Sequence, residues 1–198
     1  MSLHPKLAPE QQMTIEEFLA FADSRPEEER WELIEGVPVM NPSPIGHHQM
    51  IVTNISAFLW RFKTERGAGW FPMVGTGTRV PASEKTLPQP DVMVLERPPT
   101  DSPVSDEALV LSEVLSKSNR RADQAWRRKV YASVLNCQHY VTVSLKAVEV
   151  TAYDRASRWK GRSVTRLAEA VTLPVLGVSI PLSEIYRWTP LGERSKGR

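Results

Sequence analysis

Residues 90–135, PDVMVLERPPTDSPVSDEALVLSEVLSKSNRRADQAWRRKVYASVL, hold two apolar runs that each carry one carboxylate. Short runs rich in Val and Leu predict β-strands, so we expect strands over Val92–Leu95 and Ala108–Leu115. Asp91 stands directly before the first run, and Glu113 interrupts the second. The stretch therefore predicts two consecutive strands with a carboxylate on each.

The segments on either side add helices between strands. A capping-box pattern at Thr14 and Glu17 begins the first helix, and two apolar runs around Glu35-Gly36 predict a hairpin. Further expected elements are helices over Gly46–Arg66 and Arg120–Leu135, strands over Trp70–Val74, Thr76–Val80, Tyr140–Ser144 and Val148–Tyr153, short strands at Val164, Val171–Leu173 and Val178–Ile180, and a helical turn over Leu182–Tyr186. This alternation predicts an α/β fold: a mixed central sheet flanked by helices, with an N-terminal helix and hairpin extension.

The length of 198 residues predicts one domain. We expect it to comprise the extension (14–44), a core (45–145) and additional strands (146–188), with flexible ends at 1–13 and 189–198. The single cysteine, Cys137, excludes an internal disulfide framework. The N-terminal residues lack the apolar core of a signal peptide, and no run is long enough to span a membrane. These features favour a cytoplasmic protein.

The net charge of +2 by itself argues against a dedicated nucleic-acid binder, but the charges are segregated. Residues 14–36 hold eight acidic side chains and two arginines, whereas 117–129 hold six basic side chains and one aspartate. Residues 155–166 hold five basic side chains and no acid, and the tail from Arg187 is also basic. Basic blocks can follow phosphates or can be ordinary solvated surfaces. They indicate nucleic acid only where they share one face.

A carboxylate within a buried strand needs a compensating charge. A divalent cation supplies one, and two carboxylates on adjacent strands make an oxygen site suited to Mg²⁺ or Mn²⁺. Two plainer alternatives stay open: Asp91 caps the start of its strand, and Glu113 forms an ion pair with a following arginine. Taken together with the basic helix, the pair is a candidate phosphodiester-cleaving site.

Here the sequence resembles the PD-(D/E)XK nuclease superfamily, and it is most similar to Uma-type restriction endonucleases. The matching motifs, in order, are Glu32-Leu33-Ile34-Glu35-Gly36, Ser43-Pro44 with His48-Gln49, Pro90-Asp91-Val92, Glu113-Val114-Leu115-Ser116, and the basic helix from Asp123 to Tyr131-Ala132. The resemblance covers residues 14–186. It implies a restriction-endonuclease-like sheet, DNA as substrate, Mg²⁺ (or Mn²⁺) held by Asp91 and Glu113, and a homodimer.

The sequence departs from this pattern at the lysine. In the superfamily a lysine stands two residues after the glutamate, where this chain has Leu115, and the helix position that replaces it in Uma-type proteins is Arg127. At ~100° per residue, Arg127 shares a helix face with Asp123 and Tyr131, while Lys129 points elsewhere. Because arginine stays protonated, it cannot act as a base. Either Arg127 acts electrostatically, Lys129 reaches in, or activity is impaired.

Two further residues have two interpretations each. His48 either contacts the metal site or a phosphate, or is a capping or surface histidine. Glu32 is either a third site carboxylate, as the resemblance implies, or a half-exposed strand glutamate. Tyr131 and Cys137 are expected to pack in the core. The alternative to an endonuclease is a non-catalytic nucleic-acid-binding or structural dimeric protein that keeps the nuclease fold.

Overall fold

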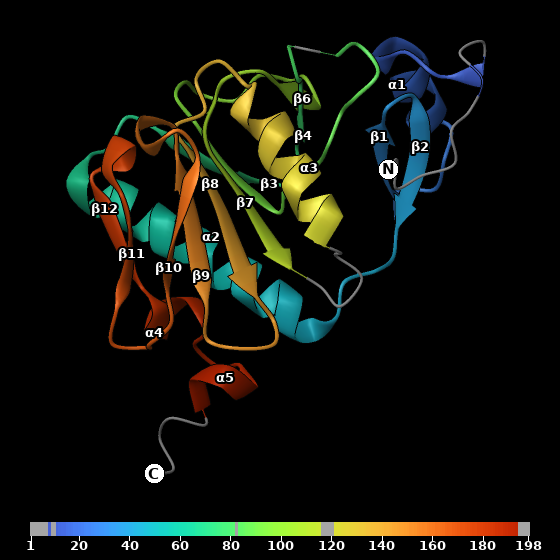
Figure 1. Cartoon of the computed structure of the whole chain (residues 1–198). Coiled ribbons are helices and arrows are strands. Elements are labelled where there is room, and N and C mark those ends of the chain that lie inside the picture. The colour runs from blue at the N-terminus through green and yellow to red at the C-terminus, as the bar shows by residue number, and fades with distance from the viewer. Residues whose placement is uncertain (1–7, 9–10, 82, 116–120, 194–198) are drawn as a thin grey trace.

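The computed structural model describes residues 8, 11–81, 83–115 and 121–193, and its centre is a six-stranded sheet (Figure 1). The strands lie in the order β10-β9-β8-β7-β5-β3. Their bounds are β3 Phe71–Val74, β5 Val92–Leu95, β7 Ala108–Leu115, β8 His139–Ser144, β9 Val150–Asp154 and β10 Lys160–Val164. Within this sheet β7 and β8 pair in parallel, and the other neighbouring strands are antiparallel. The mixed α/β fold class predicted from the sequence is confirmed.

A long helix covers each face of the sheet. Helix α2, Gly46–Arg66, lies behind the sheet in Figure 1, and helix α3, Arg121–Ala132, lies in front of it. Because successive strand side chains point to opposite faces, β5 contributes to both layers: Val92 joins the core beneath α2, and Met93 joins Tyr131 beneath α3. Helix α3 also connects the parallel strands β7 and β8, as such a pair requires.

The N-terminal extension consists of α1 Ile15–Asp23 and the hairpin of β1 Arg30–Ile34 and β2 Val37–Asn41. The capping box at the start of α1 is present. At the hairpin turn Glu35 and Gly36 have φ of 51° and 81°, a backbone conformation that glycine adopts readily. A Cβ at Gly36 would also lie 2.5 Å from Cβ of Gln12, so this position needs glycine. The hairpin and helix expected from the sequence are therefore confirmed.

The extension is attached through Leu33 to the segment that leads into β5. Its N and O atoms form hydrogen bonds of 3.2 and 2.8 Å with the backbone of Leu87, four residues before Asp91. Leu33 is fully buried in a small core with Ile15 and Phe18 of α1. This attachment fixes the neighbouring residue of β1, Glu32, against the central domain.

The C-terminal part adds a second hairpin and two short helices. These are β11 Ala170–Leu173, β12 Val178–Pro181, α4 Leu182–Ile185 and α5 Pro190–Glu193. Their apolar residues enlarge the core on the α2 side of the sheet. Thr189 is buried and α5 is helical, so the flexible tail expected from residue 189 is not seen over 189–193. Of the other residues expected to be flexible, 1–7, 9–10 and 194–198 lie outside the described residues.

Most boundaries differ from the expectation by one or two residues, and two elements are clearly shorter than expected. The strand expected over Thr76–Val80 is reduced to β4, Gly77–Thr78, which pairs in parallel with β6, Val104–Ser105. Helix α3 ends at Ala132, and the guanidinium of Arg155 donates to the carbonyl of Ala132, an acceptor that the helix end leaves free, and to that of Val134 just beyond it. Arg120, its expected start, lies outside the described residues. No helix within the described ranges has the length and apolarity needed to cross a membrane.

Candidate active site

Asp91 and Glu113 come together because β5 and β7 are antiparallel neighbours. The strand register pairs Val92 with Ser112, and continuing it by one residue sets Asp91 opposite Glu113. Oδ2 of Asp91 accepts a hydrogen bond of 2.8 Å from N of Val114, so the strand that carries Glu113 also holds Asp91. The structure thus brings together the two carboxylates singled out in the sequence.

Glu32 is a third carboxylate at this place, and it is buried, with 2% of its surface exposed. The alternative of a half-exposed strand glutamate is wrong because the extension packs against the central domain. Oε1 of Glu32 accepts a hydrogen bond of 2.8 Å from N of Gln89, which stands two residues before Asp91. Glu32 therefore faces the segment that leads into β5.

Arg127 links Glu32 to Glu113. Its Nη2 lies 2.6 Å from Oε2 of Glu32, and its Nη1 lies 2.9 Å from Oε1 of Glu113. Nη1 also donates to the hydroxyl of Tyr131 at 3.2 Å, and that hydroxyl donates to Oε1 of Glu113 at 2.6 Å. The ion pair of Glu113 with a following arginine, one of the alternatives considered above, is present. The four side chains form one connected network.

Tyr131 has a role in this network that the sequence analysis missed. It is fully buried, as expected of a core residue, but its hydroxyl fixes Oε1 of Glu113. The available signal was its position four residues after Arg127, because side chains at that helical spacing are neighbours.

The network shifts the pKa values of its members. Burial raises the pKa of Glu113 to about 7; Arg127 lowers it, and Asp91 and Glu32 raise it further. Burial lowers the pKa of Arg127, but the carboxylates of Glu113 and Glu32 outweigh burial and hold that pKa well above its usual range. Arg127 is therefore a permanent cation, and Glu113 can exchange a proton near neutral pH.

His48, near the start of α2, contacts Asp91 rather than the solvent. Its Nε2 lies 3.3 Å from Oδ2 of Asp91, and 8% of the residue is exposed. Its buried Nδ1 has no hydrogen-bond partner among the described residues. The imidazole therefore contacts the cluster through Nε2 and not through Nδ1. A surface histidine is thereby excluded.

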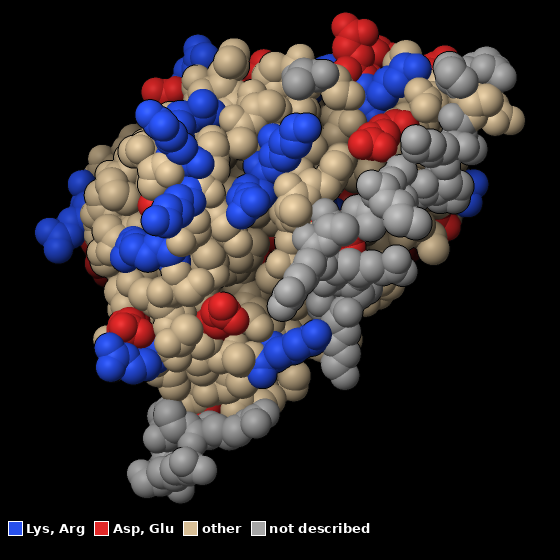
Figure 2. Space-filling view, viewed as in Figure 1, with Lys and Arg blue, Asp and Glu red and all other residues tan. Residues whose placement is uncertain are grey.

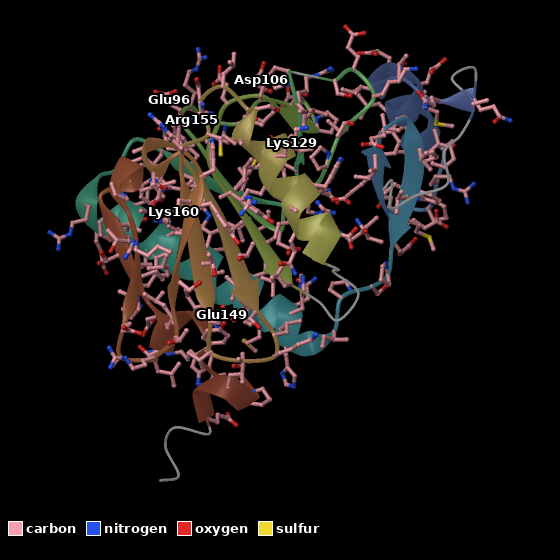
Figure 3. All side chains as sticks on the ribbon, in the orientation of Figure 1. Glu96, Asp106, Lys129, Glu149, Arg155 and Lys160 are labelled. Carbon is pink, nitrogen blue, oxygen red and sulfur yellow. The ribbon has the colours of Figure 1, made fainter. Side chains whose placement is uncertain are left out.

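Lys129 is not part of the cluster. It is exposed on α3 and points away from the sheet, where Figure 3 labels it. Lys129, Arg155 and Lys160 all lie on the face seen in Figure 2, where basic side chains gather over α3 and the β10 edge. Two of the basic blocks in the sequence thus share one face, although Arg155 is also bonded to backbone carbonyls.

A cavity of about 600 Å³ lies next to Asp91, between α2 and the strands β1 and β3. Its lining includes Arg30 and Trp60, neither of which the sequence analysis singled out. Arg30 stands two residues before Glu32 on β1, so the strand period places both side chains on one face of the hairpin. That spacing is the signal that could have identified it.

The donor atoms of the cluster fit a divalent cation of the Mg²⁺ type. Within the described residues, no group of three or more His, Cys, Asp or Glu side chains is arranged to hold a metal ion. Mg²⁺, however, usually binds one or two carboxylates and keeps several waters. Hydrogen bonds and ion pairs of the described residues engage Oδ2 of Asp91 and Oε1 of Glu113, which leaves one oxygen on each carboxylate for a metal.

Comparisons with known proteins agree with the fold. A family model described as "Putative restriction endonuclease" (Uma2) matches residues 15–183. Among solved structures, the chain is similar to one described as a putative nuclease belonging to DUF820 from Anabaena variabilis, with a TM-score of 0.72 and 14% identity. That similarity covers 89% of this chain and 98% of the other, and at this identity it shows the fold. No match was found among curated proteins.

Proposed function

Because the chain belongs to the Uma2 restriction endonuclease family, we propose that it is a metal-dependent endonuclease that hydrolyses phosphodiester bonds in DNA. One observation carries the proposal: Asp91 and Glu113 stand opposite each other on two central strands, beside the guanidinium of Arg127. Two carboxylates, those of Glu32 and Glu113, contact this single guanidinium, and Asp91 adds a third opposite Glu113, so the cluster has an excess of formal negative charge. A bound cation would balance that excess.

Asp91 and Glu113 are the residues that would hold Mg²⁺ (or Mn²⁺). When bound, such an ion lowers the pKa of a coordinated water and polarises the phosphoryl oxygen. Glu113 is oriented for this role by the hydroxyl of Tyr131, and Asp91 by N of Val114 and Nε2 of His48. These contacts hold both carboxylates in place before any ligand arrives.

Arg127 is proposed to stabilise negative charge that develops on the phosphate. It cannot act as a base because it stays protonated, but a fixed cation near the reacting group lowers the barrier electrostatically. Its hydrogen bonds to Glu32 hold the guanidinium in position, so Glu32 is assigned a positioning role. Lys129 has no role at this centre in the proposal, since it is exposed and points away.

The basic face supports DNA as the substrate. Lysine and arginine residues that share a face can follow a phosphate backbone, and Figure 2 shows such residues gathered over α3 and the β10 edge. Lys129 and Lys160 are exposed there, without a carboxylate partner among the described residues. We propose that this face contacts the duplex beyond the cleaved bond.

A specific observation also favours a second candidate, a nucleic-acid-binding protein without catalytic activity. Arg127 is hydrogen-bonded to Glu32 and Glu113 at the same time, so both carboxylates already have a cationic partner. A lysine, the residue that the resemblance leads one to expect, would offer a smaller cation whose pKa can shift. In this second reading the cluster stabilises the fold and the basic face binds DNA.

Cleavage of supercoiled plasmid in Mg²⁺ or Mn²⁺ separates the two candidates. We expect nicking by the wild type, loss of nicking in Asp91→Ala, and no change in the control Asp101→Ala, which lies in an exposed loop. Equal nicking by wild type and Asp91→Ala would contradict the endonuclease proposal. DNA binding without nicking, together with nicking by Arg127→Lys, would support the second candidate.

The homodimer and the cytoplasmic location stay predictions. Size-exclusion chromatography with light scattering tests the first: a mass of twice 22.3 kDa is expected, and a single-chain mass at all concentrations would contradict it. Fractionation of the producing cells tests the second.

A further inference from the structure

The cavity beside Asp91 is built as a groove along one side of α2. Gln49, Thr53, Ser56 and Trp60 recur at spacings of three and four residues, so they lie on one helix face. Arg30 and Gly75 contribute to the opposite wall. The groove starts at Asp91, a carboxylate of the proposed catalytic pair. It continues along α2 to the aromatic side chain of Trp60, about three helical turns beyond Gln49. Its volume of about 600 Å³ is within the range of a small-ligand site.

Trp60 presents an aromatic surface to this groove. Its exposed fraction is 43%, which is unusual for an indole that packs in a core. No other ring of the described residues stacks on it, although Phe62, two residues further along the helix, is stacked with Trp70. Trp60 is therefore free to receive a planar group, and a nucleobase is the planar group that a nuclease meets.

Arg30 provides a positive charge in the same groove. It is partly buried, and within the described residues its guanidinium has neither a hydrogen bond nor an ion pair, in contrast to those of Arg25 and Arg127, which have carboxylate partners. Its Nη2 lies over Gly75, where an added Cβ would be 3.8 Å away. A partly buried guanidinium without a counter-ion favours an anionic ligand, and its planar donors match a phosphate.

We propose that this groove binds an unpaired nucleotide of the cleaved strand, with its base against Trp60 and a phosphate on Arg30. The inference rests on the proposed function, because it takes Asp91 as the position of the scissile phosphate. In a continuous duplex both faces of each base are already stacked, so Trp60 can stack only on a base that is single-stranded, at an end, or flipped out. The groove therefore selects DNA with an unpaired stretch beside the cleaved bond.

The test measures binding without cleavage. A fluorescent single-stranded oligonucleotide and the duplex of the same sequence are titrated with the full chain in EDTA at low salt, and anisotropy is recorded. Trp60→Ala is expected to weaken single-strand binding roughly 5-fold or more, the effect of one lost base–aromatic stack, and Trp60→Phe to restore most of it. Trp188→Ala, an exposed tryptophan of another cavity, is the matched control and should bind like the wild type.

Arg30→Gln tests the phosphate contact. It is expected to weaken binding and to reduce the slope of log affinity against log salt by about one, as for one lost phosphate contact. If the wild type prefers the single strand to the duplex and this preference disappears in Trp60→Ala, the proposed nucleotide site in the groove is supported. Unchanged single-strand binding in both Trp60→Ala and Arg30→Gln, or no binding by the wild type, would overturn it.

Plasmid nicking of the same preparations in Mn²⁺ separates this inference from the proposed function. If the wild type nicks plasmid but single-strand binding is unchanged in Trp60→Ala and Arg30→Gln, the endonuclease proposal is supported and the proposed nucleotide site in the groove is wrong. Binding that depends on Trp60, with no nicking by the wild type, would support the groove as a nucleotide site while the endonuclease proposal fails.

Discussion

Arg127 on α3 and Glu32 on β1 face each other in a two-pronged ion pair, with Nη2–Oε2 and Nη1–Oε1 distances of 2.6 and 3.2 Å. The side chain of Arg127 is 14% exposed and that of Glu32 is 3% exposed. This pair joins the N-terminal hairpin to the helix that covers the central sheet. It therefore couples the stability of the extension to the geometry of the candidate site.

Removing the buried guanidinium of Arg127 should destabilise the fold more than removing the exposed guanidinium of Arg97. Arg127→Met leaves the Glu32 and Glu113 carboxylates buried without their partner, so we expect the free energy of unfolding to fall by about 3–5 kcal/mol. Arg97→Ala, which breaks the exposed pair with Glu107, should change it by roughly 0–1 kcal/mol. Urea unfolding followed by circular dichroism measures both. Equal, small effects would show that the buried pair contributes nothing.

The raised pKa of Glu113 predicts how stability changes with pH in metal-free buffer. The folded pKa of about 7 lies above the reference value of 4.5, so between these values the folded state binds more protons than the unfolded state. Stability should therefore decrease as pH rises through this window and level off above it. Glu113→Gln should lose this component of the slope. Parallel pH profiles of the wild type and Glu113→Gln would contradict the assignment.

Metal binding should stabilise the wild type through Asp91 and Glu113. A ligand that binds only the folded state at 100 times its Kd adds about 2.7 kcal/mol, so saturating Mn²⁺ should raise the Tm by several degrees. The shift should vanish in Asp91→Asn and stay in Asp101→Asn. A thermal scan with and without Mn²⁺ provides the measurement, and an equal shift in both variants would place the bound metal elsewhere.

Cys137 should be unreactive in the folded protein. It is fully buried, burial raises its pKa to about 12, and the thiolate is the reactive form. We expect slow alkylation by a maleimide in native buffer and rapid alkylation in denaturant, followed by mass spectrometry. Because Cys137 is the single cysteine, the native rate reports opening of the layer beneath α3. Rapid native labelling would mean that this layer opens readily.

Much of the architecture could be predicted from local patterns. The strands at Val92–Leu95 and Ala108–Leu115 and the helix at Gly46–Arg66 have the bounds that the sequence indicated. Runs of β-branched residues, a capping box and a glycine in a tight turn act over a few neighbours, so they can be read in order along the chain. The short parallel pair β4–β6 could not, because it joins segments 27 residues apart and the second of them, Val104–Ser105, lacks a strand pattern of its own.

The sequence also singled out most of the candidate site, because a carboxylate next to a buried strand is unusual wherever it occurs. Asp91 and Glu113 were identified in this way, Arg127 was identified through the resemblance, and helical periodicity already separated Arg127 from Lys129. The burial of Glu32 was open, since its surroundings come from Gln89 and from Arg127, 95 residues away. The groove with Arg30 and Trp60 was missed because its two walls meet only in three dimensions.

The sequence by itself determined the elements, the mixed α/β class and the residue types available for chemistry, since these follow from propensity, periodicity and charge along the chain. Only the tertiary structure decided which charges meet. Packing of the hairpin against the central domain buries Glu32 beside Arg127, and the antiparallel register of β5 and β7 sets Asp91 opposite Glu113. The physical reason is that a charge changes its pKa and its partners when it is buried, and burial depends on contacts between distant segments.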